Sequence, residues 1–113
     1  MNMWKDIKLK NVSGIDKLVS EFQVWMVGVL PYAKMKVRIY QEQNKNFVGY
    51  TDALIKTKFD ESFEGAVGHG HNVDEVLEST IQNFNEKLEE NFPNLGELGL
   101  EENDIEYAEW SGF

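Results

Sequence analysis

The sequence has 113 residues, enough for one domain with its own core, and 42% of them are hydrophobic while 27% are charged. This composition excludes a disordered or collagen-like chain, and the absence of cysteine excludes a disulfide framework, a thiol nucleophile and a cysteine-based zinc site. The net charge of -9 is unevenly distributed, because residues 1–58 hold ten Lys or Arg against five Asp or Glu, whereas residues 59–113 hold one base against fifteen acids. The acidic second half would repel a phosphate-rich ligand and attract a basic protein surface, although a solvated acidic face also promotes solubility.

Residues 1–6 lack the apolar core of a signal peptide, and the longest apolar run, residues 24–30, is much shorter than a membrane-spanning helix. We therefore expect a cytoplasmic protein that does not associate with a membrane. The chain has neither an internal repeat nor a linker, so residues 1–113 are predicted to form a single domain that ends in an acidic tail, residues 94–113.

The first strong pattern along the chain predicts a helix over residues 13–30. Its apolar residues fall at helical spacing and form one broad stripe, made of Ile15, Leu18, Val19, Phe22, Trp25, Met26, Val29 and Leu30. Ser13 can cap this helix, with Asp16 three residues later in the capping-box position. Pro31 cannot continue the hydrogen bonding of a helix, so we expect the helix to end there.

Three strands are predicted next. Residues 33–41 alternate apolar and polar side chains, which indicates a half-buried strand whose outer face is basic. The second strand covers residues 47–59, and its alternation changes phase near residues 49–53, which predicts a bulge or a kink. The third strand covers residues 63–69, and glycines at positions 65, 68 and 70 predict a turn after it.

A second helix is predicted over residues 73–91, where apolar residues again line one face. Asn72 is a favourable N-cap, and Glu75 follows three residues later. Pro93 marks the end of this helix. In the tail, residues 105–110 predict a short extra strand.

Together these elements predict an α+β fold in the order α-β-β-β-α. A three-stranded antiparallel sheet, extended by terminal strands if the weaker patterns hold, would be covered on one face by both helices, because each helix has one apolar stripe to bury. The opposite face of the sheet would be exposed and would carry Lys34, Lys36 and Arg38.

Residues 34–90 resemble two known families. Residues 63–70, followed by the helix from residue 74, look like the third strand, the Gly-x-Gly turn and the second helix of double-stranded-RNA-binding domains. The similarity to HicB antitoxins rests on residues 36–39, 47–50, 68–70 and 75–77. The first resemblance implies an RNA-binding fold, and the second implies a protein that blocks a toxin ribonuclease. Asp74 and Glu75 occupy positions where RNA-binding members place phosphate-gripping lysines, which argues against direct nucleic-acid binding.

No set of residues predicts catalysis. His69 and His71 lie two apart and are able to supply two ligands of a metal, but a place in a polar turn is the favoured explanation for them. Asp60, Glu61 and Glu64 match no calcium loop, and the Gly-x-Gly turn lacks the Lys-Ser/Thr of a P-loop. We therefore predict a protein that is not an enzyme, with no catalytic residues, no metal site and no cofactor.

The favoured functional hypothesis is an inhibitor that blocks a basic nucleic-acid-handling protein, such as a nuclease. In size and charge the chain is similar to small anti-CRISPR and anti-restriction proteins of phages, plasmids and other mobile elements, and the resemblance to HicB adds the antitoxin version of this role. The predicted partner-binding surface is acidic and consists of Glu86, Glu89, Glu90, Glu97, Glu101, Glu102, Asp104, Glu106 and Glu109.

Two alternatives stay open. The first is a self-associating adaptor, a homodimer for example, in which the basic sheet face meets the acidic half of a second copy. The second is a degenerate RNA-binding-like domain that uses a basic patch made of Lys34, Lys36, Arg38, Lys56 and Lys58. The overall negative charge disfavours the second alternative.

Overall fold

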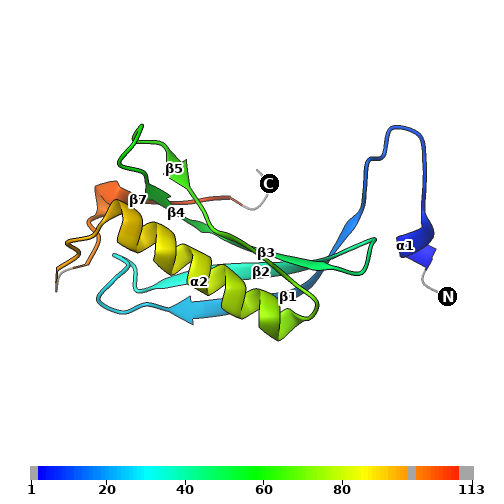
Figure 1. Cartoon of the computed structure of the whole chain (residues 1–113), viewed down its shortest axis with the longest axis horizontal. Helices are drawn as coiled ribbons and strands as arrows, with labels where there is room; N and C mark the ends of the chain where they lie inside the picture. Colours follow the sequence, from blue (N-terminus) through cyan, green and yellow to red (C-terminus); the bar gives the residue numbers. More distant parts are fainter. Residues whose placement is uncertain (1–2, 97–98, 110–113) are drawn as a thin grey trace.

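The computed structural model describes residues 3–96 and 99–109 and has two antiparallel sheets with one long helix (Figure 1). The elements in chain order are α1 (Met3–Asp6), β1 (Asp16–Trp25), β2 (Lys34–Glu42), β3 (Phe47–Thr51), β4 (Ala53–Lys56), β5 (Phe63–Glu64), β6 (Val67–Gly70), α2 (Val73–Asn91), the 3₁₀ helix η1 (Glu102–Asp104) and β7 (Ile105–Tyr107). Sheet A has the strand order β1-β2-β3-β6, and sheet B has the order β5-β4-β7. The predicted α+β class is confirmed, whereas the predicted order α-β-β-β-α is wrong.

The first predicted helix is the main error, because residues 16–25 form β1, which pairs with β2 along its whole length. Phe22 and Val24 lie opposite the inward-facing residues of β2, and Glu21, Gln23 and Trp25 lie on the other face, which is strand alternation. A bulge between Leu18 and Ser20 shifts this alternation by one residue, so the apolar positions also fit a helical period. The β-branched and aromatic residues of this stretch favour the strand.

The second and third predicted strands each divide in two. Residues 47–59 break at Asp52, where the phase change predicted a kink, so β3 joins sheet A while β4 joins sheet B. Residues 63–69 break at Gly65 and Ala66 and give β5 in sheet B and β6 in sheet A. The predicted Gly-x-Gly turn is also wrong, because Gly68 and Gly70 both lie within β6.

Three predicted elements are confirmed in place. The strand predicted over residues 33–41 is β2, and the helix predicted over residues 73–91 is α2. The Asn72 side chain caps α2 by accepting a hydrogen bond from the backbone N–H of Glu75 at 2.8 Å. The strand predicted in the tail is β7, which covers residues 105–107 and pairs with β4.

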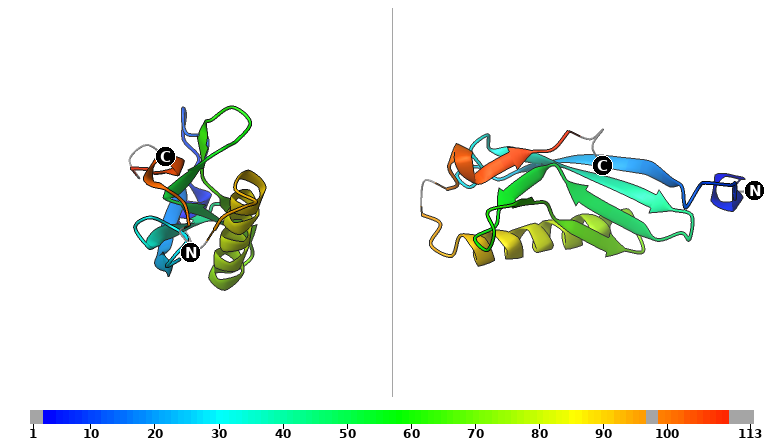
Figure 2. Two further views of the ribbon diagram at one scale, coloured as in Figure 1. Left: turned by 90° about the vertical axis from the view of Figure 1, so that its left-hand side faces the viewer. Right: turned by 90° about the horizontal axis from the view of Figure 1, so that it is seen from above.

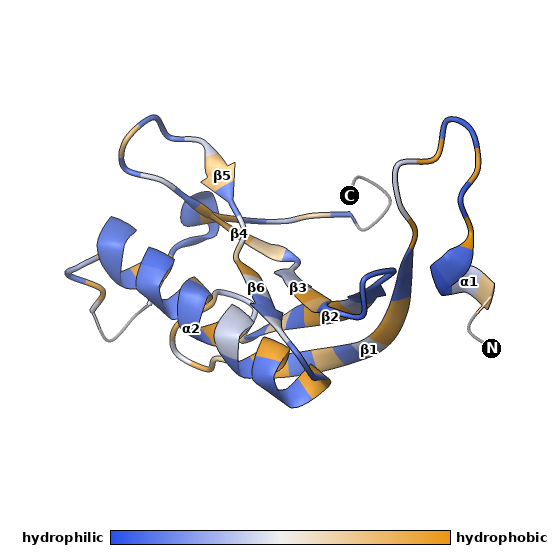
Figure 3. Ribbon diagram, turned by 45° about the vertical axis from the view of Figure 1, so that its right-hand side comes forward, coloured by the Kyte–Doolittle hydropathy of each residue, from blue (hydrophilic) through white to orange (hydrophobic). Residues whose placement is uncertain are grey.

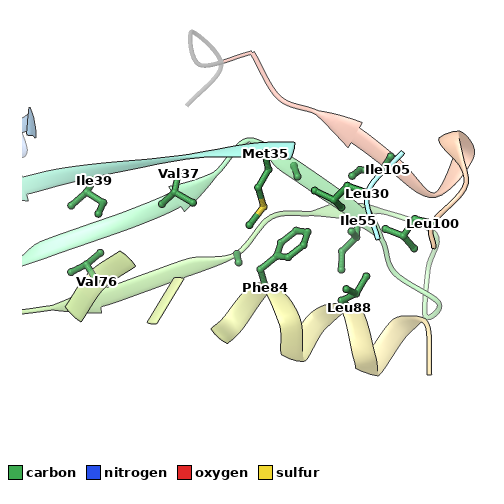
Figure 4. Close-up of a cluster of buried hydrophobic side chains, with 12 residues drawn as sticks. Leu30, Met35, Val37, Ile39, Ile55, Val76, Phe84, Leu88, Leu100 and Ile105 are labelled. Carbon is green, nitrogen blue, oxygen red and sulfur yellow. The ribbon is translucent and has the colours of Figure 1, made fainter. Parts of the chain in front are cut away.

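Helix α2 covers one face of sheet A, and the opposite face of the sheet is open (Figure 2). Its buried residues follow the i, i+4 spacing and are Val76, Thr80, Phe84 and Leu88. Figure 4 shows Phe84 between Met35 of sheet A and Ile55 of sheet B, while Leu88, Leu100 and Ile105 continue the core toward η1. One hydrophobic core therefore joins the two sheets.

The N-terminal segment lies at the end of the molecule farthest from η1 (Figure 1). Gln43 holds it there, because its side-chain amide donates hydrogen bonds to the backbone carbonyls of Trp4 and Ile7 at 2.9 and 3.0 Å. Helix α1 buries no residue, so the sheets and α2 form the core without it. Over the described residues, no helix combines the length and the apolar composition needed to cross a membrane.

Candidate functional site

Six of the predicted acidic residues gather at one end of the molecule. The last two turns of α2 carry Glu86, Glu89 and Glu90, and η1 with the residue before it carries Glu101, Glu102 and Asp104. Both elements lie at the same end of the molecule (Figure 1), and Figure 2 shows them apart, with strands between them. We call these six residues the acidic end. Glu106 and Glu109 extend away from it along and beyond β7, and Glu97 lies outside the described residues.

The acidic end carries few internal counterions. Among the described residues, the acids in ion pairs are Glu21, which pairs with Lys36 and Arg38, and Glu64, which pairs with Lys87 at 3.3 Å. Glu86, Glu89, Glu90, Glu101 and Glu102 are all exposed. Glu101 and Asp104 also form a capping box at the start of η1, in which the Asp104 carboxylate accepts a hydrogen bond from the backbone N–H of Glu101 at 3.1 Å. In Figure 3 the ribbon at this end of α2 has mostly the colour of hydrophilic residues.

The predicted basic patch does not form one surface. Lys34, Lys36 and Arg38 lie on the open face of sheet A, whereas Lys56 belongs to β4 of sheet B and Lys58 follows it. The bases on β2 also have partners on β1. The Arg38 Nε atom lies 2.6 Å from Glu21 Oε2, and the Lys34 ammonium lies 5.3 Å from the centre of the Trp25 ring.

A cavity of about 380 Å³ opens where β7 of sheet B meets the beginning of β2. We call it the junction pocket, and its walls are formed by Gln23, Tyr32, Lys34, Met35, Lys36, Asp52 and Tyr107. The sequence did not predict that these residues form a site together. Asp52 stands at the break between β3 and β4, which is the one local signal in the sequence that points to it.

Two hydrogen bonds fix the polar groups of the junction pocket. The Asp52 Oδ1 atom accepts the backbone N–H of Lys36 at 2.7 Å, and the Tyr107 hydroxyl donates to the Lys34 carbonyl at 2.7 Å. The rings of Tyr32 and Tyr107 meet edge to face with their centres 5.8 Å apart. The walls are mainly apolar, and Asp52 is half-buried in them.

Burial raises the pKa of the Asp52 carboxyl above its ordinary value of 3.8, although three backbone hydrogen bonds and the charge of Lys36 act in the opposite direction. Burial also raises the pKa of Tyr107, and the negative charge of Asp52 adds to this effect. Within the described residues Asp52 forms no ion pair. Asp52 is therefore a half-buried carboxylate that is held by backbone hydrogen bonds and not by an ion pair.

The pKa values of Asp52 and Asp60 are expected to lie on opposite sides of the ordinary aspartate value. Hydrogen bonds from the Ser62 and Thr57 hydroxyls and from the Ser62 backbone lower the pKa of Asp60 to about 2. Asp60 should therefore stabilise the fold above pH about 4 and lose this effect as the pH falls toward 2, whereas protonation of Asp52 should favour the folded state. A carbon-detected NMR titration of the two carboxyl groups tests this, and equal midpoints would contradict it.

The histidines do not come together with other ligands. His69 is exposed on β6, and His71 follows the strand with its backbone N–H donating to Glu75 Oε1 at 3.3 Å. Among residues 3–96 and 99–109, no three His, Cys, Asp or Glu side chains are grouped so as to hold a metal ion.

No family model, no curated protein and no solved structure matches this chain. The resemblance to HicB antitoxins and RNA-binding domains thus rests on short motifs alone. The α-β-β-β-α order suggested this resemblance, and the structure departs from that order because it has β1 in place of the first predicted helix.

Proposed function

We propose that the protein is a non-enzymatic binding protein that blocks a basic nucleic-acid-handling protein, such as a nuclease, by covering its phosphate-binding surface. The observation that carries this proposal is the acidic end, where α2 and η1 place exposed carboxylates at the same end of the molecule, with few counterions among the described residues. Such a cluster attracts a basic surface and repels nucleic acid.

The carboxylates of the acidic end are held on ordered elements. Phe84 and Leu88 anchor the C-terminal half of α2 to the core, and the backbone N–H of Leu100 donates to the Val29 carbonyl at 2.8 Å just before η1. Fixed charges bind a rigid partner surface at a lower entropic cost than charges on a mobile tail.

The structure removes part of the support for charge-driven self-association. The bases on the open face of sheet A lie against Glu21 and Trp25 of β1 in the same molecule, so they offer less free charge to the acidic end of a second copy. An adaptor or a dimer stays the alternative, because β1 lies at the edge of sheet A and an edge strand can pair with a strand of another chain.

Reversing the charge of the acidic end is expected to weaken partner binding at least tenfold. The test variant carries Glu89→Lys, Glu90→Lys, Glu101→Lys and Glu102→Lys, all at exposed positions. Binding to a panel of purified basic nucleases, and inhibition of each nuclease on its own substrate, would be measured between about 50 and about 300 mM salt. This range shortens the Debye length about twofold. Wild-type binding should weaken steeply as the salt rises.

The matched control changes the same total charge elsewhere, with lysine at four exposed acids: Asp6, Asp16, Asp74 and Glu78. It should bind within about threefold of the wild type, because longer-range charge is screened at these salt concentrations. An equal loss in both variants would assign the effect to net charge and overturn the assigned surface. Sedimentation of the protein alone over the same salt range should show a monomer, and a stable dimer would favour the adaptor.

A further inference from the structure

The junction pocket lies next to the acidic end. Tyr107, one of its walls, is the last residue of β7, and β7 follows η1 directly. A protein that docks on the acidic end therefore has the junction pocket within reach of the same interface.

Asp52 is the one acidic residue of the junction pocket, and Lys34 and Lys36 also line it. The two lysines that line the pocket have their ammonium groups near partners on β1: the Lys34 group lies over the Trp25 ring, and the Lys36 Nζ atom lies 3.9 Å from Glu21 Oε1. Lys36 attracts Asp52, but among the described residues no base forms an ion pair with this carboxylate. The pocket is thus a mainly apolar cavity with one half-buried carboxylate whose lysine neighbours are held toward β1.

The aromatic walls fit a flat cation. Tyr32 is 58% exposed, so one of its ring surfaces is available to a ligand, and the hydrogen bond from the Tyr107 hydroxyl to Lys34 fixes the second ring. A guanidinium group stacks on aromatic rings and forms paired hydrogen bonds with a carboxylate, whereas an ammonium group is a compact, strongly hydrated point charge.

We propose that the junction pocket binds the side chain of an arginine on the basic partner, with Asp52 as its carboxylate and Tyr32 and Tyr107 as its aromatic walls. This inference deepens the proposed function and rests on it. A nucleotide is the competing ligand, because its base would stack on the same rings and Lys34 and Lys36 line the pocket, but the net charge of -9 disfavours a nucleic acid.

The test uses the full chain and small probes that need no identified partner. Backbone amide NMR shifts would be followed while N-acetyl-arginine methylamide is added, with N-acetyl-citrulline methylamide as a neutral probe of nearly the same shape and guanosine monophosphate as a nucleotide probe. The arginine probe is expected to give saturable shifts at Tyr32, Asp52 and Tyr107, and the citrulline probe is expected to bind at least tenfold more weakly.

Asp52→Asn is expected to weaken binding of the arginine probe about tenfold or more, because it removes the charge and keeps the oxygen that accepts the Lys36 backbone N–H. The exposed Asp16→Asn is the matched control and should bind like the wild type. If Asp52→Asn disturbs the fold, Tyr32→Ala replaces it, since this exposed ring can be removed without opening the core.

Equal binding of the arginine and citrulline probes, no saturable shift with arginine, or tighter binding of guanosine monophosphate at the same residues would each overturn the arginine pocket. Failure of this test with a salt-sensitive partner still bound at the acidic end would leave the proposed function standing. If the arginine probe binds in the pocket but no basic nuclease binds the protein, the arginine pocket would stand and the proposed function would be overturned.

Discussion

Replacing Gly68 by alanine is expected to lower the free energy of unfolding by about 3 kcal/mol, because this glycine lets α2 approach sheet A. A Cβ atom at position 68 would lie 2.5 Å from the backbone nitrogen of Thr80 and 2.8 Å from its Cα atom. Since these are backbone atoms of the helix, the clash can be relieved only if the helix moves away from the sheet. Urea denaturation measures the loss, and Gly14→Ala, where a Cβ meets nothing within 4 Å, should change stability by less than about 0.5 kcal/mol.

Gly49, which pairs with Gly68 across β3 and β6, offers a sharper comparison. A Cβ there would meet side chains only, namely the Thr80 hydroxyl and, at 2.9 Å, Val76 Cγ1. Thr80→Ala should therefore recover part of the stability lost in Gly49→Ala and little of that lost in Gly68→Ala. Equal recovery in both backgrounds would show that the side chain of Thr80, and not the backbone of α2, limits how closely the helix packs.

This contact shows what the sequence could and could not predict. The glycines of β6 were visible in the sequence, but they predicted a turn, because a close approach between a strand and a helix depends on residues from two elements. Helix α2 was predictable, since its cap, its apolar stripe and its end are all local. Strand β1 was not, since one bulged residue made its alternation look helical.

The candidate sites divide in the same way, into local features that the sequence shows and contacts between distant residues that it does not show. The acidic composition of the second half was visible in the sequence, although the sequence could not show that η1 and the end of α2 lie at the same end of the molecule. The basic patch was predicted as one surface and is divided, because the break at Asp52 sends Lys56 into sheet B. The junction pocket depends on Tyr32, Asp52 and Tyr107, which lie far apart in the chain and meet only when the two sheets pack together.

Phe84→Ala is expected to cost about 3–5 kcal/mol of stability, the range for removing a fully buried phenylalanine side chain. Phe84 contacts the core where the two sheets meet, with Met35 of β2 on one side and Ile55 of β4 on the other (Figure 4). Because the total stability of a domain is about 5–15 kcal/mol, this loss would remove a large part of it. Thermal unfolding followed by circular dichroism should show a midpoint lower by more than about 10 °C.

The matched control is Phe59→Ala, which removes the same side chain from a position that is 95% exposed and should change stability by less than about 0.5 kcal/mol. Amide hydrogen exchange then tests whether the core is shared. Because Phe84 lies between the sheets, protection should fall by a similar factor in β2 and in β4. A loss confined to β4 would mean that sheet B unfolds on its own, and the junction pocket, whose walls come from both sheets, would then open without unfolding of sheet A.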